Sequence, residues 1–143
     1  MMKQKFKKEE ILQILSGILV FISFFQAWIY DGGLNYFYGS ELKSMLIDPP
    51  FLLNLIYLLL ILGVANVYYG WNRKYNGTLS WTTAIVVFLL LWTIVSFNSK
   101  SEDLVAGNGF YMAGMGMIAA IASIVVVRKE RATIESERKG IDK

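Results

Sequence analysis

The chain alternates long apolar segments with short polar ones. Uncharged, mostly apolar residues run without interruption over 11–30, 51–70, 79–97 and 109–127, and polar or charged residues fill the intervals. A helix rises 1.5 Å per residue, so about 20 apolar residues cross a hydrocarbon layer of roughly 30 Å. The pattern therefore predicts an all-α four-helix transmembrane bundle, formed by a single membrane domain over residues 1–143. The charged residues after 127 are expected to extend the last helix.

Small residues form a stripe on the last predicted helix. They recur at intervals of 3, 4, 3, 4 and 3 residues, which places them on one face of a helix. A face of small residues lets two helices approach closely inside a bilayer. We expect this face to pack against another helix of the same chain, and a contact between copies is the alternative. The stripe consists of Ala106, Gly109, Ala113, Gly116, Ala120 and Ser123.

Uncharged polar side chains inside the spans are expected to form hydrogen bonds between helices. Gln26 and Asn54 lie at similar depths near the ends of the first two spans, so they are expected to face the interior and to bond to each other. Asn66 shares a face of the second span with two glycines. A polar path or ligand pocket through the bundle is the alternative. On the first span, one face carries Gln13, Ser16, Ser23 and Ala27.

Composition supports a membrane protein and excludes several kinds of chemistry. Apolar residues make up 55% of the chain and charged residues 17%, whereas soluble domains carry about 25% charged residues. The absence of Cys and His excludes disulfides, Cys/His metal sites and histidine general bases. We therefore expect no catalytic, cofactor-binding or metal-binding residues, and a protein that is not an enzyme. The net charge of +3 gives no support to nucleic-acid binding.

The basic residues predict the orientation in the membrane. The two tails and the 71–78 turn hold every Lys and Arg except Lys43 and Lys100. By the positive-inside rule, this is a multi-pass protein of the cell membrane with cytoplasmic N- and C-termini. The 31–50 and 98–108 loops then lie outside. Trp28 and Tyr30, at the outer end of the first span, are expected in the interfacial aromatic belt.

The first outer loop, residues 31–50, is the largest predicted segment outside the bilayer on its side. Residues 34–38 are expected either to pair with 41–46 as a short β-hairpin across Gly39 and Ser40, or to lie on the membrane as an amphipathic segment. Its aromatic residues Tyr36, Phe37 and Tyr38 are candidate partner contacts. Insertion into the headgroup region is the alternative for them.

A resemblance follows from three segments of the chain. They are FFQAWI at 24–29, YGSEL at 38–42 and GNGFYMAGMGMI at 107–118. In this layout the sequence resembles a loose class of small uncharacterised prokaryotic four-helix membrane proteins. It is also similar in outline to claudin-like proteins, which have four spans, cytoplasmic termini and a longer first outer loop. Claudins carry a Trp-Gly-Leu-Trp segment and two cysteines there, and this chain has only Gly33-Leu34, so a junction function is not implied.

The expected function is that of a non-catalytic accessory subunit, or an interaction or scaffold protein, with the 31–50 loop as its contact surface. Its expected partners are the lipid bilayer and either another membrane protein or further copies of itself. The alternative is an oligomeric transporter or channel component. Small four-helix proton-coupled exporters need a carboxylate within the membrane. The nearest carboxylates, Glu9 and Glu10, are expected at the cytoplasmic edge, which argues against that mechanism.

Overall fold

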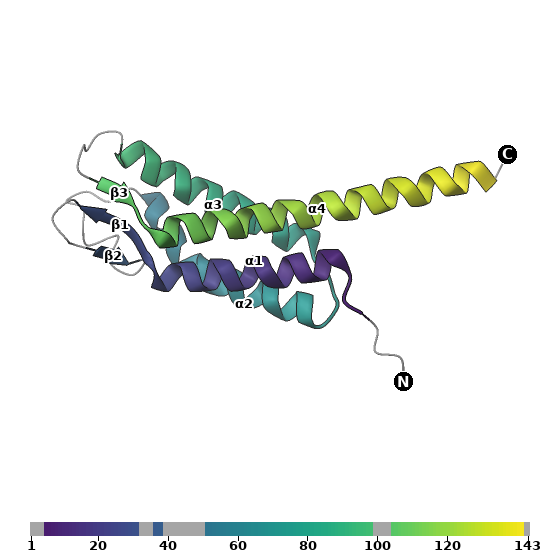
Figure 1. Ribbon diagram of the computed structural model, residues 1–143, viewed down its shortest axis with the longest axis horizontal. Coiled ribbons are helices and arrows are strands. Elements are labelled where there is room, and N and C mark those ends of the chain that lie inside the picture. The colour runs from purple at the N-terminus through teal and green to yellow at the C-terminus, as the bar shows by residue number, and fades with distance from the viewer. Residues whose placement is uncertain (1–4, 32–35, 39–50, 99–103, 142–143) are drawn as a thin grey trace.

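The computed structural model describes residues 5–31, 36–38, 51–98 and 104–141. These residues form four α-helices, which pack as a bundle, and three short strands at one end of it (Figure 1). The helices are α1 (Lys8–Phe25), α2 (Leu58–Trp71), α3 (Gly77–Asn98) and α4 (Asn108–Ile141), and a 3₁₀ helix, η1 (Phe51–Tyr57), leads into α2. The strands are β1 (Ala27–Asp31), β2 (Tyr36–Tyr38) and β3 (Leu104–Ala106).

Helix α1 is central to the packing, since it lies against both α2 and α4, and α3 packs on α4. The core between the helices is built from aliphatic and aromatic side chains such as Val20, Leu59, Val87 and Leu90, all fully buried. Both described ends of the chain lie at the end of the bundle opposite the strands (Figure 1). Helix α4 continues well beyond the bundle on that side, as the charged sequence after 127 predicts.

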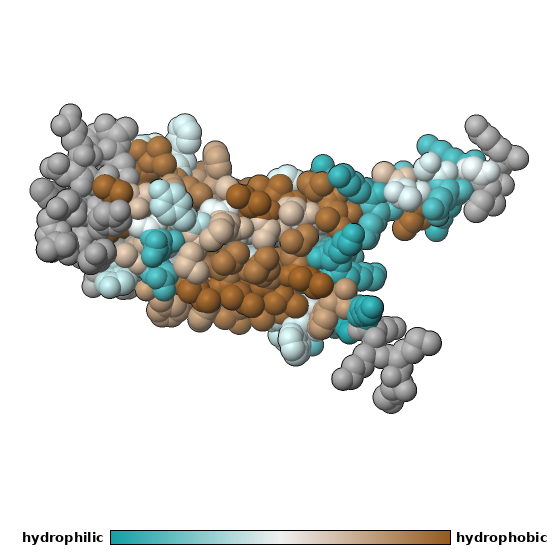
Figure 2. Space-filling model, viewed as in Figure 1, coloured by the Kyte–Doolittle hydropathy of each residue, from teal (hydrophilic) through white to brown (hydrophobic). Residues whose placement is uncertain are grey.

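The outer surface of the bundle is that of a membrane protein. Among the described residues, three helical segments are long and apolar enough to cross a bilayer: Asn54–Trp71, Gly77–Ser96 and Asn108–Gly140. Helix α1 begins with three charged residues, Lys8, Glu9 and Glu10, and is uncharged from there to its end. Figure 2 shows a broad apolar surface over the middle of the bundle, with hydrophilic residues gathered at the end where the termini lie.

The first helix is shorter than the sequence predicts, because it ends at Phe25 and not at residue 30. The backbone turns extended at Gln26, with φ −92° and ψ 160°, and β1 follows. Periodicity does not separate a short buried strand from a helical turn, and Trp, Ile and Tyr all favour strands. Residues 104–106, expected within a loop, form β3, which pairs antiparallel with β1 from Ile29↔Ala106 to Asp31↔Leu104.

One strand of the predicted hairpin lies among the described residues, and its partner there is a segment that the sequence did not indicate. Residues 36–38 do form a strand, but β2 pairs antiparallel with β1, in a register that joins Ala27 to Tyr38 and Tyr30 to Tyr36. The sheet therefore has the order β2-β1-β3, with the segment after the first helix as its middle strand. The expected partner segment, residues 41–46, lies outside the described residues.

Candidate functional site

Trp28 joins the sheet to the bundle. Its side chain is fully buried, and its indole Nε1 donates a hydrogen bond of 2.7 Å to the Ser23 carbonyl near the end of α1. Its own carbonyl accepts a bond of 2.8 Å from the Gly107 N–H, just before α4 begins. Gly109 leaves room for the indole, since a Cβ there would lie 2.7 Å from Trp28 Cδ1. The expectation that Trp28 lies in an interfacial belt is therefore wrong, because the indole anchors β1 between α1 and α4.

The sheet carries the three aromatic residues expected to contact a partner. Tyr36, Phe37 and Tyr38 together make up β2, an edge strand among the three described. The Tyr38 side chain is 45% exposed, and so is that of Val105 on β3, the other edge. Two apolar or aromatic side chains thus reach the surface from a sheet whose middle strand is fixed to the bundle by Trp28.

The stripe of small residues faces α1 along α4. A Cβ at Gly116 would lie 2.7 Å from Val20 Cγ2, and the Ser16 hydroxyl donates a bond of 2.8 Å to the Gly116 carbonyl. The stripe begins later than predicted, because Ala106 lies in β3 and is only half-buried. The other five members are buried on α4: Gly109, Ala113, Gly116, Ala120 and Ser123.

The face predicted on the first span also loses its last member, because Ala27 lies in β1. Its other members, Gln13, Ser16 and Ser23, are fully buried on α1.

A buried cluster of polar side chains joins all four helices near the end of the bundle that bears the termini. Asn66 on α2 accepts a bond of 3.2 Å from Gln13 Nε2 on α1 and donates one of 2.7 Å to Thr83 Oγ1 on α3. Ser123 on α4 donates to Ser80 Oγ at 3.3 Å. We call this set the polar cluster, and its members are Gln13, Asn66, Tyr75, Asn76, Ser80, Thr83 and Ser123.

The turn between α2 and α3 closes the polar cluster. The Asn76 N–H donates to Gln13 Oε1 at 3.2 Å, and the Asn76 carbonyl accepts from Gln13 Nε2 at 3.1 Å. The Tyr75 hydroxyl lies 3.1 Å from Ser123 Oγ. Every side chain of the cluster therefore has a partner within the protein, which is what low-dielectric surroundings demand of buried polar groups. These hydrogen bonds link α1 to α2, α2 to α3 and α3 to α4.

Gln26 and Asn54 do not meet in the way the sequence predicts. Gln26 lies between α1 and β1, Asn54 lies in η1, and both are half-buried. The hydrogen bonds of the described residues include none between their side chains. The end of α1 at Phe25 explains this, because a helical register no longer relates Gln26 to the second span. The sequence predicts a role for Asn66 but not for the turn residues Tyr75 and Asn76, which bond to Ser123 and Gln13 in the structure.

Two acidic side chains at the start of α1 are more buried than their expected place at the membrane edge suggests. Glu9 and Glu10 are 6% and 5% exposed. Glu10 Oε2 accepts a bond of 2.9 Å from the Lys7 N–H, which caps the helix. Glu9 Oε2 has no hydrogen-bond partner among the described residues. No group of three or more His, Cys, Asp or Glu side chains comes together in the described part of the chain.

The comparisons with known proteins assign no relative to this chain. No protein family, no curated protein and no solved structure matches it.

Proposed function

We propose that this protein is a non-catalytic interaction subunit of the cell membrane that crosses the bilayer four times and keeps both termini in the cytoplasm. Three helices have the length and apolar character of membrane spans, and the uncharged part of α1 packs between α2 and α4 in the same bundle. The end of the bundle with the termini also carries the basic turn residues Arg73 and Lys74, in keeping with the positive-inside rule.

The observation that carries the proposal is the sheet held at the opposite end of the bundle. Packing against helices stabilises a small sheet, and Trp28 supplies that attachment here. Tyr38 and Val105 then project from strands that are fixed in position. Aromatic side chains on a rigid support lose little conformational entropy on binding, which suits a contact with another membrane protein.

Site-specific photocrosslinking in intact cells tests the proposal. A crosslinking amino acid at position 38 should capture one other membrane protein in near-stoichiometric yield. The same group at position 92, where Trp92 is exposed on α3, should capture only lipid or nothing. Tyr38→Glu should lower co-purification of the captured protein by about ten-fold, the effect of losing a modest hot spot. Capture at position 92 alone, or no protein capture at position 38, would reject the sheet as the contact surface.

An oligomeric transporter is the second candidate, and Glu9 is the observation that favours it. Its carboxyl group is buried at the end of the bundle with one oxygen lacking a partner among the described residues, and membrane transporters use such carboxylates for protons and cations. Liposomes holding the purified protein would then show a cation or proton flux that Glu9→Gln abolishes. A flux of that kind would replace the interaction proposal.

A further inference from the structure

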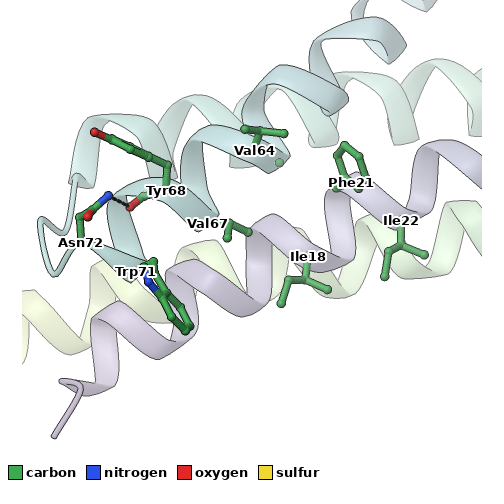
Figure 3. Close-up of a pocket in the computed structure, with 9 residues that line it drawn as sticks. Ile18, Phe21, Ile22, Val64, Val67, Tyr68, Trp71 and Asn72 are labelled. Carbon is green, nitrogen blue, oxygen red and sulfur yellow. Dashed lines mark hydrogen bonds between the residues drawn. The ribbon is translucent and has the colours of Figure 1, made fainter. Parts of the chain in front are cut away.

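Two hollows on the surface of the bundle differ in the side chains that line them. The first, between α1 and α2, has a volume of about 510 Å³ and is lined mostly by apolar side chains such as Ile18, Val64 and Val67 (Figure 3). Such a surface suits the acyl chains of any lipid and cannot recognise one headgroup. The second, between the start of α3 and α4, has a volume of about 270 Å³, and two arginines are among its lining residues.

We call the second hollow the arginine cavity. One wall comes from α3 and the turn before it, and the other wall comes from α4. Along α4 toward its end, the lining changes from apolar to basic. No acidic side chain is among the described residues that line the cavity. The residues that define it are Tyr75, Trp81, Ile124, Val127, Arg128 and Arg131.

The two arginines lie near each other on α4, because side chains three residues apart are neighbours on a helix. The Arg128 guanidinium lies 5.9 Å from the centroid of the Trp81 ring, so a cation–π attraction holds it toward α3. In the described part of the chain, neither Arg128 nor Arg131 forms an ion pair with a carboxylate. Like charges on one helix face repel each other, and an anion bound between them would remove that repulsion.

The arginine cavity lies where the apolar spans meet charged segments. The apolar span of α3 begins at Gly77, and the charged part of α4 begins at Arg128. Trp81, which is 45% exposed, also lines this region, and indole rings of membrane proteins gather at the level of the lipid headgroups. In a bilayer, the phosphate groups of the leaflet on the side of the termini would therefore lie at the level of the two guanidinium groups.

We propose that the arginine cavity binds the phosphate of an anionic phospholipid from the leaflet on the side of the termini. Arg128 and Arg131 donate hydrogen bonds to the phosphate oxygens, because the planar guanidinium group matches the geometry of a phosphate. The glycerol and the first acyl carbons lie against the apolar lining residues Ile124 and Val127. Two positive charges without an acidic neighbour in the cavity favour an anionic headgroup over a zwitterionic one. A soluble phosphate compound has no part that matches the apolar wall.

Native mass spectrometry of the detergent-purified full chain tests the headgroup contact. The protein is mixed with equal amounts of phosphatidylglycerol and phosphatidylcholine of the same acyl chains, and it should retain mainly the former. The variant Arg128→Gln/Arg131→Gln should lose at least about ten-fold of this preference, since each basic residue near an anionic lipid contributes roughly five-fold. Glutamine is chosen because it is long, uncharged and nearly as favourable in a helix as arginine.

The matched control is Lys129→Gln/Arg138→Gln, which removes the same charge from exposed positions of α4 outside the cavity. It should keep the preference for phosphatidylglycerol. Equal retention of both lipids by the unmodified protein, or an equal loss of preference in the control, would overturn the proposal.

A second pair of variants tests the cavity without changing the charge. Val127→Phe fills space beside the arginines and should lower retention of phosphatidylglycerol by at least about five-fold, because the larger side chain occupies the volume that the lipid needs. Val125→Phe, at a 43% exposed position of α4 outside the cavity, should have no effect. Undiminished retention in the Val127→Phe variant would exclude the cavity as the lipid site.

A competition experiment separates a lipid from a soluble phosphate compound. Glycerol phosphate is added to the unmodified protein in large molar excess over the bound phosphatidylglycerol. The lipid should stay bound, because glycerol phosphate makes no contact with the apolar wall. Displacement of the lipid by glycerol phosphate would assign the arginine cavity to a soluble phosphate compound and reject the lipid assignment.

Discussion

Asn66 is the residue on which the hydrogen bonds of the polar cluster converge. It is fully buried, and its amide donates to the Leu62 carbonyl at 2.8 Å as well as to Thr83, while its oxygen accepts from Gln13. Its amide group therefore connects three helices at once. In lipid, where water cannot replace a lost partner, such a residue defines which helices associate and in what register.

We predict that Asn66→Leu lowers the free energy of unfolding by about 1–2 kcal/mol, because it removes two interhelical bonds in exchange for a similar volume of apolar atoms. The measurement is a titration with denaturing detergent, followed by circular dichroism. The matched control is Thr82→Val, since the Thr82 hydroxyl is exposed and bonds only to the Thr78 carbonyl of its own helix. Equal effects of the two substitutions would contradict a special role for Asn66.

The sequence predicts the surroundings of the Asn66 side chain correctly and those of the Trp28 side chain incorrectly, for a physical reason. An Asn in an apolar span has few alternatives to facing another helix, so its polarity alone places it. Trp28 has an apolar body with one polar atom, and such a side chain suits either an interface or a core. Only the position of the Ser23 carbonyl, which depends on where α1 ends, decides between these environments.

At the scale of the elements, α1 is the helix on which the others assemble. Its face toward α4 meets the small residues of that helix, and its face toward α2 carries Gly17 against Gly63. Backbone contact of this kind is what small residues provide in membranes, where dispersion forces between close helices replace the hydrophobic effect. Close packing at small residues thus joins α1 to α2 on one face and to α4 on the adjacent face.

Gly17→Ala and Gly114→Ala separate this packing role from helix propensity. Alanine at 17 would place a Cβ 2.6 Å from a backbone oxygen of α2, so α1 and α2 must move apart, at a cost of about 1–3 kcal/mol. At Gly114 the nearest atom, Leu91 Cδ1, lies 3.7 Å away, and alanine should stabilise α4 by about 0.5–1 kcal/mol. Thermal unfolding of both variants in one detergent gives the comparison, and a stabilised Gly17→Ala variant would contradict it.

The elements that escape sequence prediction are the short ones. The long helices are uniform enough that their apolar runs locate them, although α1 ends five residues before its predicted end and residues 51–57 of the second span form the 3₁₀ helix η1. A strand such as β3 has three residues and receives its partners from β1, which lies far away in sequence. The strand conformation of β3 therefore depends on the folded bundle. The regular spacing of small residues assigned Ala106 to a helix for this reason, although it lies in β3.

For the molecule as a whole, the two ends differ in charge and structure. One end carries the termini and the turn with Arg73 and Lys74, and the other carries the sheet (Figure 1). Charge asymmetry of this kind sets the direction of insertion because basic segments are retained on the cytoplasmic side.

Cysteine labelling of intact cells checks this orientation without background, because the chain has no cysteine of its own. Val105→Cys, exposed on β3, should react with a membrane-impermeant maleimide. Lys74→Cys, exposed in the turn, should react only after the cells are permeabilised. Among the residues of this turn, Lys74 is a better labelling site than Asn76, because Asn76 forms hydrogen bonds in the polar cluster. Labelling of Lys74→Cys in intact cells would reverse the proposed orientation.

Helix α4 is longer than a bilayer is thick. Its 34 residues give a length of about 51 Å at 1.5 Å per residue, against a hydrocarbon thickness of roughly 30 Å. In a membrane, some 20 Å of continuous helix would therefore extend beyond the apolar layer, and the contact with α1 would hold the start of this extension in place. A reporter domain fused after α4 would lie at a fixed distance from the lipid headgroups if this helical extension is rigid. Energy transfer from a labelled bilayer surface to the reporter would measure that distance and its spread.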